Sequence, residues 1–137
     1  EGLIDPKRSI HVGLRTYNPE DHGFTILEAP WVHEHGVAAT IAEIERVTGG
    51  HKAYLTFDID CLDPAYAPGT GTPVAGGPSS AKMLSVLHKL INLDIRGADI
   101  VEVAPAYDYA DITAIAGAAV AQHYLGLLAE KRATGKR

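Results

Sequence analysis

Residues 53–60 read AYLTFDID, and this stretch decides the fold. Its tyrosine, leucine, threonine, phenylalanine and isoleucine are typical of a β-strand. The chain must turn soon afterwards, at Asp63-Pro64. It then enters a segment over 68–77 that reads PGTGTPVAGG. Because this segment is too rich in proline and glycine for regular structure, we expect a shaped loop beyond the end of the strand.

Short β-rich runs alternate with helical patterns on both sides of this strand. The alternation is typical of βαβ units and predicts an α/β fold with a parallel sheet. Ser79 is the expected cap of the second helix, and Gly49-Gly50 is expected to end the first. We expect roughly half of a typical large open sheet, with an adhesive edge where the other half is missing. The expected strands are 9–14, 53–60 and 98–103, and the expected helices are 34–47, 79–92 and a last one from a cap at Asp111 to about Glu130.

Composition limits the class of protein. The chain has 137 residues and a formal net charge of −5, which fits one ordinary domain. The acidity is spread along the sequence and argues against nucleic-acid binding, which needs clustered lysine and arginine. The only basic cluster lies over 131–137, and we expect it to be a solvated tail. Because the chain starts at Glu1 and its single methionine is Met83, we expect a piece of a longer protein.

Two further features indicate a cytoplasmic protein that does not bind membranes. The longest uncharged stretch, 112–129, is rich in alanine and glycine and is interrupted by Gln122 and His123. It therefore predicts a packing helix rather than a membrane span. Cys61 is the only cysteine, so there is no disulfide framework and a reducing compartment is expected.

Asp58 and Asp60 are the first candidate site residues. Side chains alternate faces along a strand, so both aspartates are expected on the face opposite Phe57, with Cα atoms roughly 6.6 Å apart. The carboxyl end of a parallel strand is where open α/β sheets place their ligands. Two ionised carboxylates repel each other, and a hard cation such as Mg²⁺ or Mn²⁺ between them would keep both charged. The alternative is that one or both are solvated or cap a nearby helix.

Glu102 is the third candidate, a carboxylate near the end of the expected 98–103 strand. It lies between two valines, and an acid in such an apolar run needs a partner. One candidate partner is a ligand guanidinium group, which would pair with it bidentately. The other is an internal salt bridge with Arg15 or Arg96.

Other motifs carry weaker signals. The 68–77 loop lacks the Gly-Lys-Ser/Thr ending of a phosphate-binding loop, although Thr70 and Thr72 offer hydroxyl groups. His33 and His35 are spaced as metal ligands on a strand could be, but they precede an expected helix and are interpreted as surface residues. Cys61 has no obvious base nearby, so a buried thiol is favoured over a nucleophile.

The phrases FDIDCLDPAYAPGTGTPVAGG, over 57–77, and VEVAPAYD, over 101–108, resemble the ureohydrolase family, which includes arginases and agmatinases. The resemblance extends from EGLIDPKRSIHVGLRTYN at the start to the final alanine-rich helix. The phrases CLDPAYAPGTGTP and EVAPAYD are closer to agmatinases than to arginases. The resemblance implies a three-layer α/β/α fold with a mostly parallel sheet, of which residues 1–130 would be the C-terminal part of one domain.

The resemblance also implies an activity. Agmatinases hydrolyse the guanidinium group of agmatine to urea and putrescine, a step in polyamine biosynthesis, through a hydroxide bridging two Mn²⁺ ions. By resemblance, Asp58 and Asp60 match a pair of metal ligands and Glu102 matches the carboxylate that orients the guanidinium group. Thr72 is a candidate contact in the substrate pocket. The family commonly forms trimers and hexamers, so a homo-oligomer is implied for the whole protein.

Part of the family pattern does not occur in this sequence. Family members carry GGDHS-like and DAHxD-like segments with the remaining metal ligands, and a histidine that assists proton transfer. These are expected upstream of Glu1, so the isolated polypeptide is expected to be inactive. The alternatives are an arginase or guanidinobutyrase specificity, or a non-catalytic fragment that only associates with other subunits. A Mg²⁺-dependent phosphatase of the haloacid dehalogenase type also has a strand ending in Asp-x-Asp, but it carries threonine where this chain has Leu62.

Overall fold

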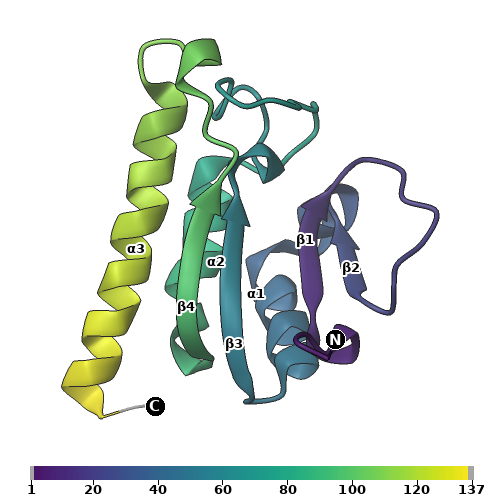
Figure 1. The fold of residues 1–137 in the computed structure, drawn as a ribbon, viewed down its shortest axis with the longest axis vertical. Coiled ribbons are helices and arrows are strands. Elements are labelled where there is room, and N and C mark those ends of the chain that lie inside the picture. Colours follow the sequence, from purple (N-terminus) through teal and green to yellow (C-terminus); the bar gives the residue numbers. More distant parts are fainter. Residues whose placement is uncertain (1, 136–137) are drawn as a thin grey trace.

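Parallel strands connected by helices form the framework of the chain (Figure 1). The structure is a computed structural model that describes residues 2–135. The predicted α/β fold with parallel strands is confirmed, because β1 pairs with β2 and β3 pairs with β4, both in parallel. The strands are β1 (Ile10–Leu14), β2 (Thr25–Glu28), β3 (Lys52–Asp58) and β4 (Asp94–Val101), and the helices are α1 (Ala29–Thr48), α2 (Ser80–His88) and α3 (Ile112–Thr134).

The pairing of β3 with β4 fixes where both strands end. In the register of this pair, Phe57 lies opposite Ile100 and Asp58 lies opposite Val101. The side chains of β3 alternate as expected for a strand covered on one face, since Phe57 is 4% exposed and Tyr54 is 64% exposed. The carboxyl ends of both strands therefore reach the same edge (Figure 1).

The core lies on one face of the β3–β4 pair, where α1 and α2 pack (Figure 1). α3 packs against α2 and β4 and extends the same core. The opposite face of the pair is open within residues 2–135: it carries Tyr54, whose hydroxyl donates to Asp99 Oδ2 at 3.1 Å. The core residues are Ile44, Phe57, Ile59, Leu62, Ala67, Met83, Val86, Leu87, Leu90, Leu93, Ile95, Val120 and Leu127.

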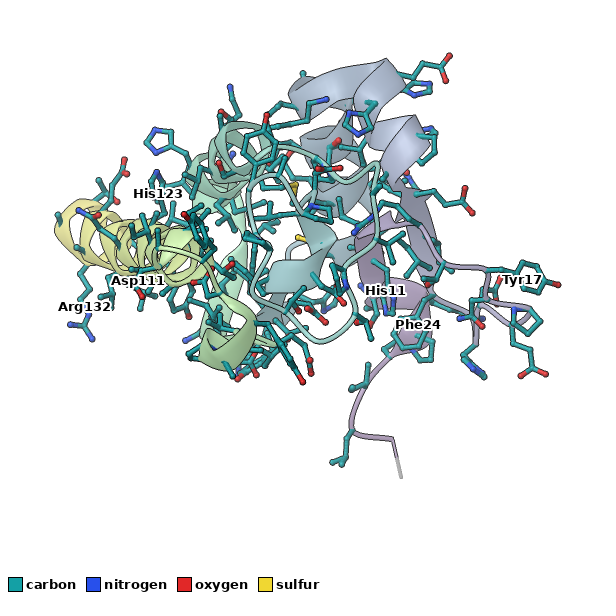
Figure 2. All side chains as sticks on the ribbon, turned by 90° about the horizontal axis from the view of Figure 1, so that it is seen from above. His11, Tyr17, Phe24, Asp111, His123 and Arg132 are labelled. Atoms are coloured by element: carbon teal, nitrogen blue, oxygen red, sulfur yellow. The ribbon has the colours of Figure 1, made fainter. Side chains whose placement is uncertain are left out.

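The two strand pairs are not hydrogen-bonded to each other in the described part of the chain. β1 and β3 each keep one edge without a strand neighbour there. The pairs are joined instead by α1, which packs against β1 and β2 as well as α2. They also meet where β1 reaches a 3₁₀ turn, η2 (Ile59–Cys61), that follows β3. Seen from above, the loop carrying Tyr17 projects away from the strands, on the side opposite α3 (Figure 2).

Helix α1 begins earlier than the expected start at residue 34. Its first segment starts at Ala29 with a proline in the first turn, a position that tolerates the missing N–H. Gly36 interrupts the helix with a φ of 76° and a ψ of −175°, a conformation that glycine adopts without steric cost. The expected end is confirmed: Gly49 is left-handed, and its N–H donates to the Glu45 carbonyl.

The other boundaries differ in smaller ways. β2 was not expected, because four residues are too few to show an alternating pattern. β4 covers Asp94–Val101, so it begins four residues before the expected 98–103 strand and ends two residues before it. α2 ends at His88, and a 3₁₀ turn over 90–92 replaces the expected last turn. The expected Ser79 cap is confirmed, since Ser79 Oγ accepts from the Lys82 N–H at 3.1 Å.

Helix α3 extends beyond its expected end near residue 130. Lys131 is only 7% exposed, and its Nζ donates to the Leu93 carbonyl, so the expectation of a solvated tail is wrong for this residue. The long aliphatic stem of lysine lets it pack at such a position. Arg132 is exposed, as expected, but belongs to the helix. Lys136 and Arg137 lie outside the described residues. α3 is long and apolar enough to cross a membrane by length and composition, with a mean hydropathy of 1.4, yet here it packs against α2 and β4.

The cap of α3 is Asp108 and not the expected Asp111. Asp111 is left-handed with a φ of 57°, and its side chain makes no capping hydrogen bond. Asp108 Oδ1 accepts from Thr113 N–H and Oδ2 accepts from Ala114 N–H, both at 3.0 Å. Burial tends to raise the pKa of Asp108, but these N–H groups together hold it below the usual value.

We expect Asp108→Asn to lower the Tm of the protein by roughly 5 °C, whereas Asp111→Asn should leave it unchanged. At position 108, the new amide would place an NH₂ group against a backbone N–H of α3. At position 111, no capping bond exists to be lost. Thermal unfolding followed by circular dichroism measures both. Equal Tm values for the two variants would contradict the assignment of the cap.

Candidate active site

The candidate site lies at the edge where β3 and β4 end (Figure 1). Asp58 is the last residue of β3, and Glu102 directly follows Val101, its partner in β4. Asp60 lies two residues beyond Asp58, and the 68–77 loop brings Thr72 to the same place. The four residues expected from the sequence therefore meet at one edge.

The two aspartates are not arranged as expected. Asp60 lies in η2, because the Asp60 N–H donates to Asp58 Oδ1 at 3.0 Å and ends the strand. Aspartate side chains form such local turns readily and compete with strand pairing. The prediction that both side chains share one strand face is therefore wrong for Asp60. The alternative that an aspartate caps a helix holds for Asp58, which caps η2.

Thr72 fixes the second aspartate. Its Oγ1 donates to Asp60 Oδ2 at 2.8 Å. Within the described residues, one oxygen of each carboxylate, Oδ2 of Asp58 and Oδ1 of Asp60, has no hydrogen-bond donor. The expectation that Thr72 contacts substrate remains a prediction, but its hydroxyl already has a role in orienting Asp60.

Glu102 occupies an unusual backbone position. Its φ of 65° is left-handed, which is rare for a residue with a side chain and costs about 1–2 kcal/mol. The conformation turns the chain off β4 and brings the side chain to the loop: a Cβ added at Gly71 would lie 3.7 Å from Glu102 Oε2. A strained residue of this kind is often found in functional sites.

The expected internal partners of Glu102 are absent. Arg96 Nε pairs with Asp94 Oδ1 at 2.8 Å, and the guanidinium group of Arg15 donates only to backbone carbonyls. The internal salt bridge is therefore wrong for both arginines. Pairing of Glu102 with a ligand guanidinium group stays a prediction.

Negative charge accumulates at this edge. Burial raises the pKa of Asp58, and the charges of Asp60 and Glu102 raise it further, while the Asp60 N–H opposes them. A cation bound among these carboxylates would offset their mutual repulsion and the free-energy cost of removing them from solvent. The electrostatics therefore favour a cationic ligand or a metal ion.

The structure also tests whether these residues fit a metal ion. Asp58 and Asp60 supply hard oxygen donors, which suit Mg²⁺ or Mn²⁺. Residues 2–135 contain no group of three or more histidine, cysteine, aspartate or glutamate side chains that could hold a metal ion. The two aspartates therefore fit as part of a ligand set that other residues would complete.

The 68–77 loop is hydrogen-bonded to α3 and to the segment after β4. Gly69 N–H donates to Thr113 Oγ1 at 2.7 Å, and Ala104 N–H donates to the Gly69 carbonyl at 2.8 Å. A Cβ at Gly69 would lie 2.5 Å from Asp108 Cβ and 2.7 Å from its Cα. Only glycine allows this approach. The sequence marked the loop as shaped, but this contact joins residues too distant in sequence to be foreseen.

The weaker candidates stay outside the site. His33 and His35 are exposed in the first segment of α1, as expected for surface residues: His33 Nε2 lies 3.1 Å from the Gly76 carbonyl, and His35 stacks on Trp31. Cys61 is half-buried, and the loss of solvent around its thiol raises the pKa to about 12. The interpretation of Cys61 as an inert thiol is therefore supported, because the thiolate is the reactive form.

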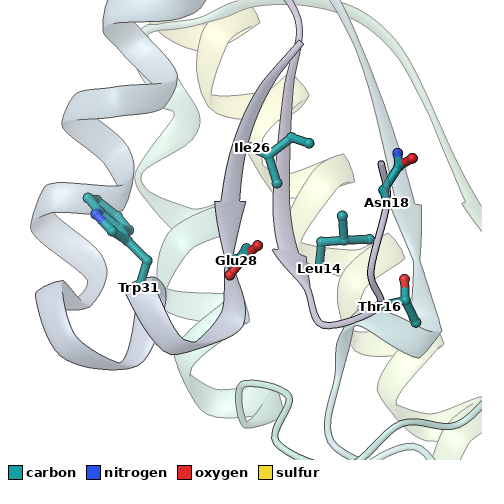
Figure 3. Close-up of a pocket in the computed structure, with 6 residues that line it drawn as sticks. All are labelled: Leu14, Thr16, Asn18, Ile26, Glu28 and Trp31. Carbon is teal, nitrogen blue, oxygen red and sulfur yellow. The ribbon is translucent and has the colours of Figure 1, made fainter. Parts of the chain in front are cut away.

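A hollow lies at the ends of β1 and β2 (Figure 3). Its volume is about 240 Å³, and none of the site residues expected from the sequence lines it. The carboxylates instead stand on an open edge. The lining residues are Leu14, Thr16, Asn18, Ile26, Glu28 and Trp31.

Comparison with known proteins gives consistent matches. The model of the arginase family matches residues 1–126. An agmatinase of Chromobacterium violaceum is 55% identical over 135 residues, which make up 98% of this chain and 42% of that protein. The chain thus spans about two fifths of the length of the curated relatives it matches.

Solved structures agree in fold. The crystal structure of a hypothetical agmatinase from Burkholderia thailandensis superposes with a TM-score of 0.95 at 59% identity, covering 97% of this chain and 42% of that one. Proclavaminate amidino hydrolase from Streptomyces clavuligerus gives a TM-score of 0.86 at 36% identity, covering 91% and 44%. The partial arginase-like fold implied by the sequence is therefore confirmed.

The glycine contact in the loop yields a test with a matched control. We expect Gly69→Ala to lower the Tm by more than about 5 °C, because its Cβ would collide with the backbone and side chain of Asp108. Gly71→Ala, in the same loop, meets only ordinary contact distances and should leave the Tm nearly unchanged. Differential scanning calorimetry compares the two, and a tolerated Gly69→Ala would refute the close approach.

Proposed function

This chain belongs to the arginase family, and from that premise we propose that the protein containing it is an agmatinase. Such an enzyme hydrolyses the guanidinium group of agmatine to urea and putrescine. Relatives named agmatinase, 53–55% identical over nearly the whole chain, support this specificity. Because the chain spans only 42% of such a relative, the activity is proposed for the whole protein.

One observation carries the proposal: three carboxylates converge at the ends of two paired strands, and none of them forms an ion pair within the described residues. Asp58 and Asp60 are linked by the turn, and Glu102 is close enough for its charge to raise the pKa of Asp58. The described residues place no lysine or arginine in an ion pair with any of the three. An edge with this charge suits a cationic substrate such as a guanidinium compound.

Different residues of the site are proposed to bind the metal and the substrate. Family members depend on a binuclear metal centre, and we propose Mn²⁺ as the metal, held in part by Asp58 and Asp60. When bound, the metal would lower the pKa of water and so supply a nucleophile at neutral pH. Thr72 orients Asp60 through its hydroxyl. Glu102 binds and orients the guanidinium group, and its two oxygens match the fork of N–H donors.

Other properties of the whole protein remain proposals, some from the composition of the chain and some from the family resemblance. These are a cytoplasmic location, a homo-oligomer of three or six subunits, a role in polyamine biosynthesis, and no binding to nucleic acid or membrane. Arginine and 4-guanidinobutyrate are the rival substrates, and a non-catalytic subunit is the rival role. The phosphatase alternative is excluded by membership of the arginase family.

The isolated chain of residues 1–137 should release no urea from agmatine, even with excess Mn²⁺. The described residues supply two candidate ligands and no complete metal site. Urea release is measured by a colorimetric assay, with circular dichroism to establish that the chain is folded and with the whole protein as the positive control. Substantial urea release by the isolated chain would overturn this expectation.

In the whole protein, Glu102→Gln should reduce kcat/KM for agmatine at least about 100-fold, because the amide loses the charge that pairs with the guanidinium group. Asp99→Asn, an acidic residue on the open face of the same sheet, is the matched control and should change kcat/KM less than about twofold. Steady-state kinetics with agmatine, arginine and 4-guanidinobutyrate provide the comparison. If the wild-type protein has a higher kcat/KM for arginine or 4-guanidinobutyrate than for agmatine, the agmatinase assignment is wrong. If Glu102→Gln turns over agmatine as the wild type does, the proposed role of Glu102 is wrong.

A further inference from the structure

We propose that Arg15 is a positioning residue that holds the turn of the metal-binding aspartates and the 68–77 loop in one geometry. Arg15 directly follows β1, and its guanidinium group is half-buried beneath η2. It has no ion-pair partner among residues 2–135. The inference rests on the proposed function, because it assigns the positioning of residues that would bind the metal.

The hydrogen bonds of Arg15 reach three segments. Nη1 donates to the Gly13 carbonyl at 2.8 Å and to the Cys61 carbonyl at 2.9 Å. Nη2 donates to the Asp60 carbonyl at 2.7 Å and to the Val74 carbonyl at 2.8 Å, and Nε donates to Val74 at 3.1 Å. A guanidinium group has five N–H donors, and these five bonds use all of them.

The loop is also bonded to this part of the chain through Thr72 and Asp60 and through the Gly76 N–H and Asp63 Oδ2, but Arg15 is the side chain that brings the end of β1 into the same network. The β1–β2 pair and the β3–β4 pair share no strand hydrogen bonds in the described part of the chain. Arg15 therefore connects the end of β1 to η2 at the candidate site, and it also connects both to the loop at Val74, two residues beyond Thr72. Carbonyl groups of a turn need donors when buried, and here one side chain supplies several of them.

The consequence for the site follows from the geometry. Arg15 holds the backbone of Asp60, while Thr72 holds its carboxylate. With both constraints in place, Asp60 Oδ1 keeps one orientation and remains available for a metal ion. Without Arg15, the bonds from Thr72 to Asp60 and from the Gly76 N–H to Asp63 Oδ2 remain, but the backbone carbonyl of Asp60 loses its donor, and the bond between Asp60 and Thr72 is weakened. Groups that orient metal ligands in this way typically affect metal affinity by 10–100-fold.

Only arginine fits this role. A lysine carries three donors on a single nitrogen and cannot replace five bonds that come from three nitrogen atoms. Arg15→Lys keeps the positive charge and so separates the hydrogen-bond geometry from the electrostatic effect. Arg46→Lys is the matched control. Arg46 uses its guanidinium group for hydrogen bonds as well, but both go to Glu43 Oε2 on the exposed side of α1.

The test is a Mn²⁺ titration of the metal-free whole protein by isothermal calorimetry, combined with steady-state kinetics. We expect Arg15→Lys to weaken Mn²⁺ binding at least about tenfold and to lower kcat, with KM for agmatine changed less than about threefold, since Arg15 makes no bond to Glu102. Arg46→Lys should bind Mn²⁺ as the wild type does. In a Thr72→Val background, Arg15→Lys should have a smaller effect on affinity, because both residues act through Asp60.

Unchanged Mn²⁺ affinity in Arg15→Lys, with the wild type binding normally, would overturn the inference and leave the proposed function intact. Failure of the wild type to bind Mn²⁺ or to hydrolyse any of the guanidino substrates would overturn both. If Arg15→Lys does not fold, Arg15→Gln, which retains an amide donor, takes its place in the titration. If neither variant folds, Arg15 is a general structural residue and the inference is wrong.

Discussion

The parallel pairing of β3 with β4 is the constraint on which the site depends. The register that sets Asp58 opposite Val101 makes both strands end at one level, so Glu102 starts its left-handed turn beside the aspartates. A shift by a single residue would turn the strand faces over and expose Phe57 to solvent. The hydrophobic core therefore fixes the position of the carboxylates.

Local hydrogen bonds complete the arrangement that the strands begin. Asp58 ends its own strand by accepting from the Asp60 N–H, and Thr72 closes the loop onto Asp60. Beneath them, Gly69 and Arg15 attach the loop and the turn to the scaffold. Each of these bonds limits how far a carboxylate can move. Pre-organised ligands of this kind bind a cation without first losing conformational freedom.

Short-range patterns in the sequence predicted the parts of the molecule that depend on neighbouring residues. Alternation in β3, the Ser79 cap and the end of α1 at Gly49 are such features. The strand pattern also indicated Asp58, Asp60 and Glu102, and the family phrases implied their roles and that of Thr72. Features that depend on contacts across the fold were missed. The burial of Lys131 needs the Leu93 carbonyl, and the cap at Asp108 depends on how the chain approaches α3. The sequence indicates Arg15 only as a candidate partner for Glu102, because nothing in it shows that the donors of Arg15 reach carbonyls far along the chain.

The central claim is that the aspartates at the end of β3 hold a metal ion in the whole protein. It is tested most directly by Mn²⁺ titration of the metal-free whole protein carrying Asp58→Ala or Asp60→Ala, with Asp99→Ala as a control on the open face of the same sheet. Loss of one oxygen ligand should weaken Mn²⁺ binding at least about 100-fold at either site position, and the control should bind as the wild type does. Unchanged Mn²⁺ affinity in both site variants would contradict the account.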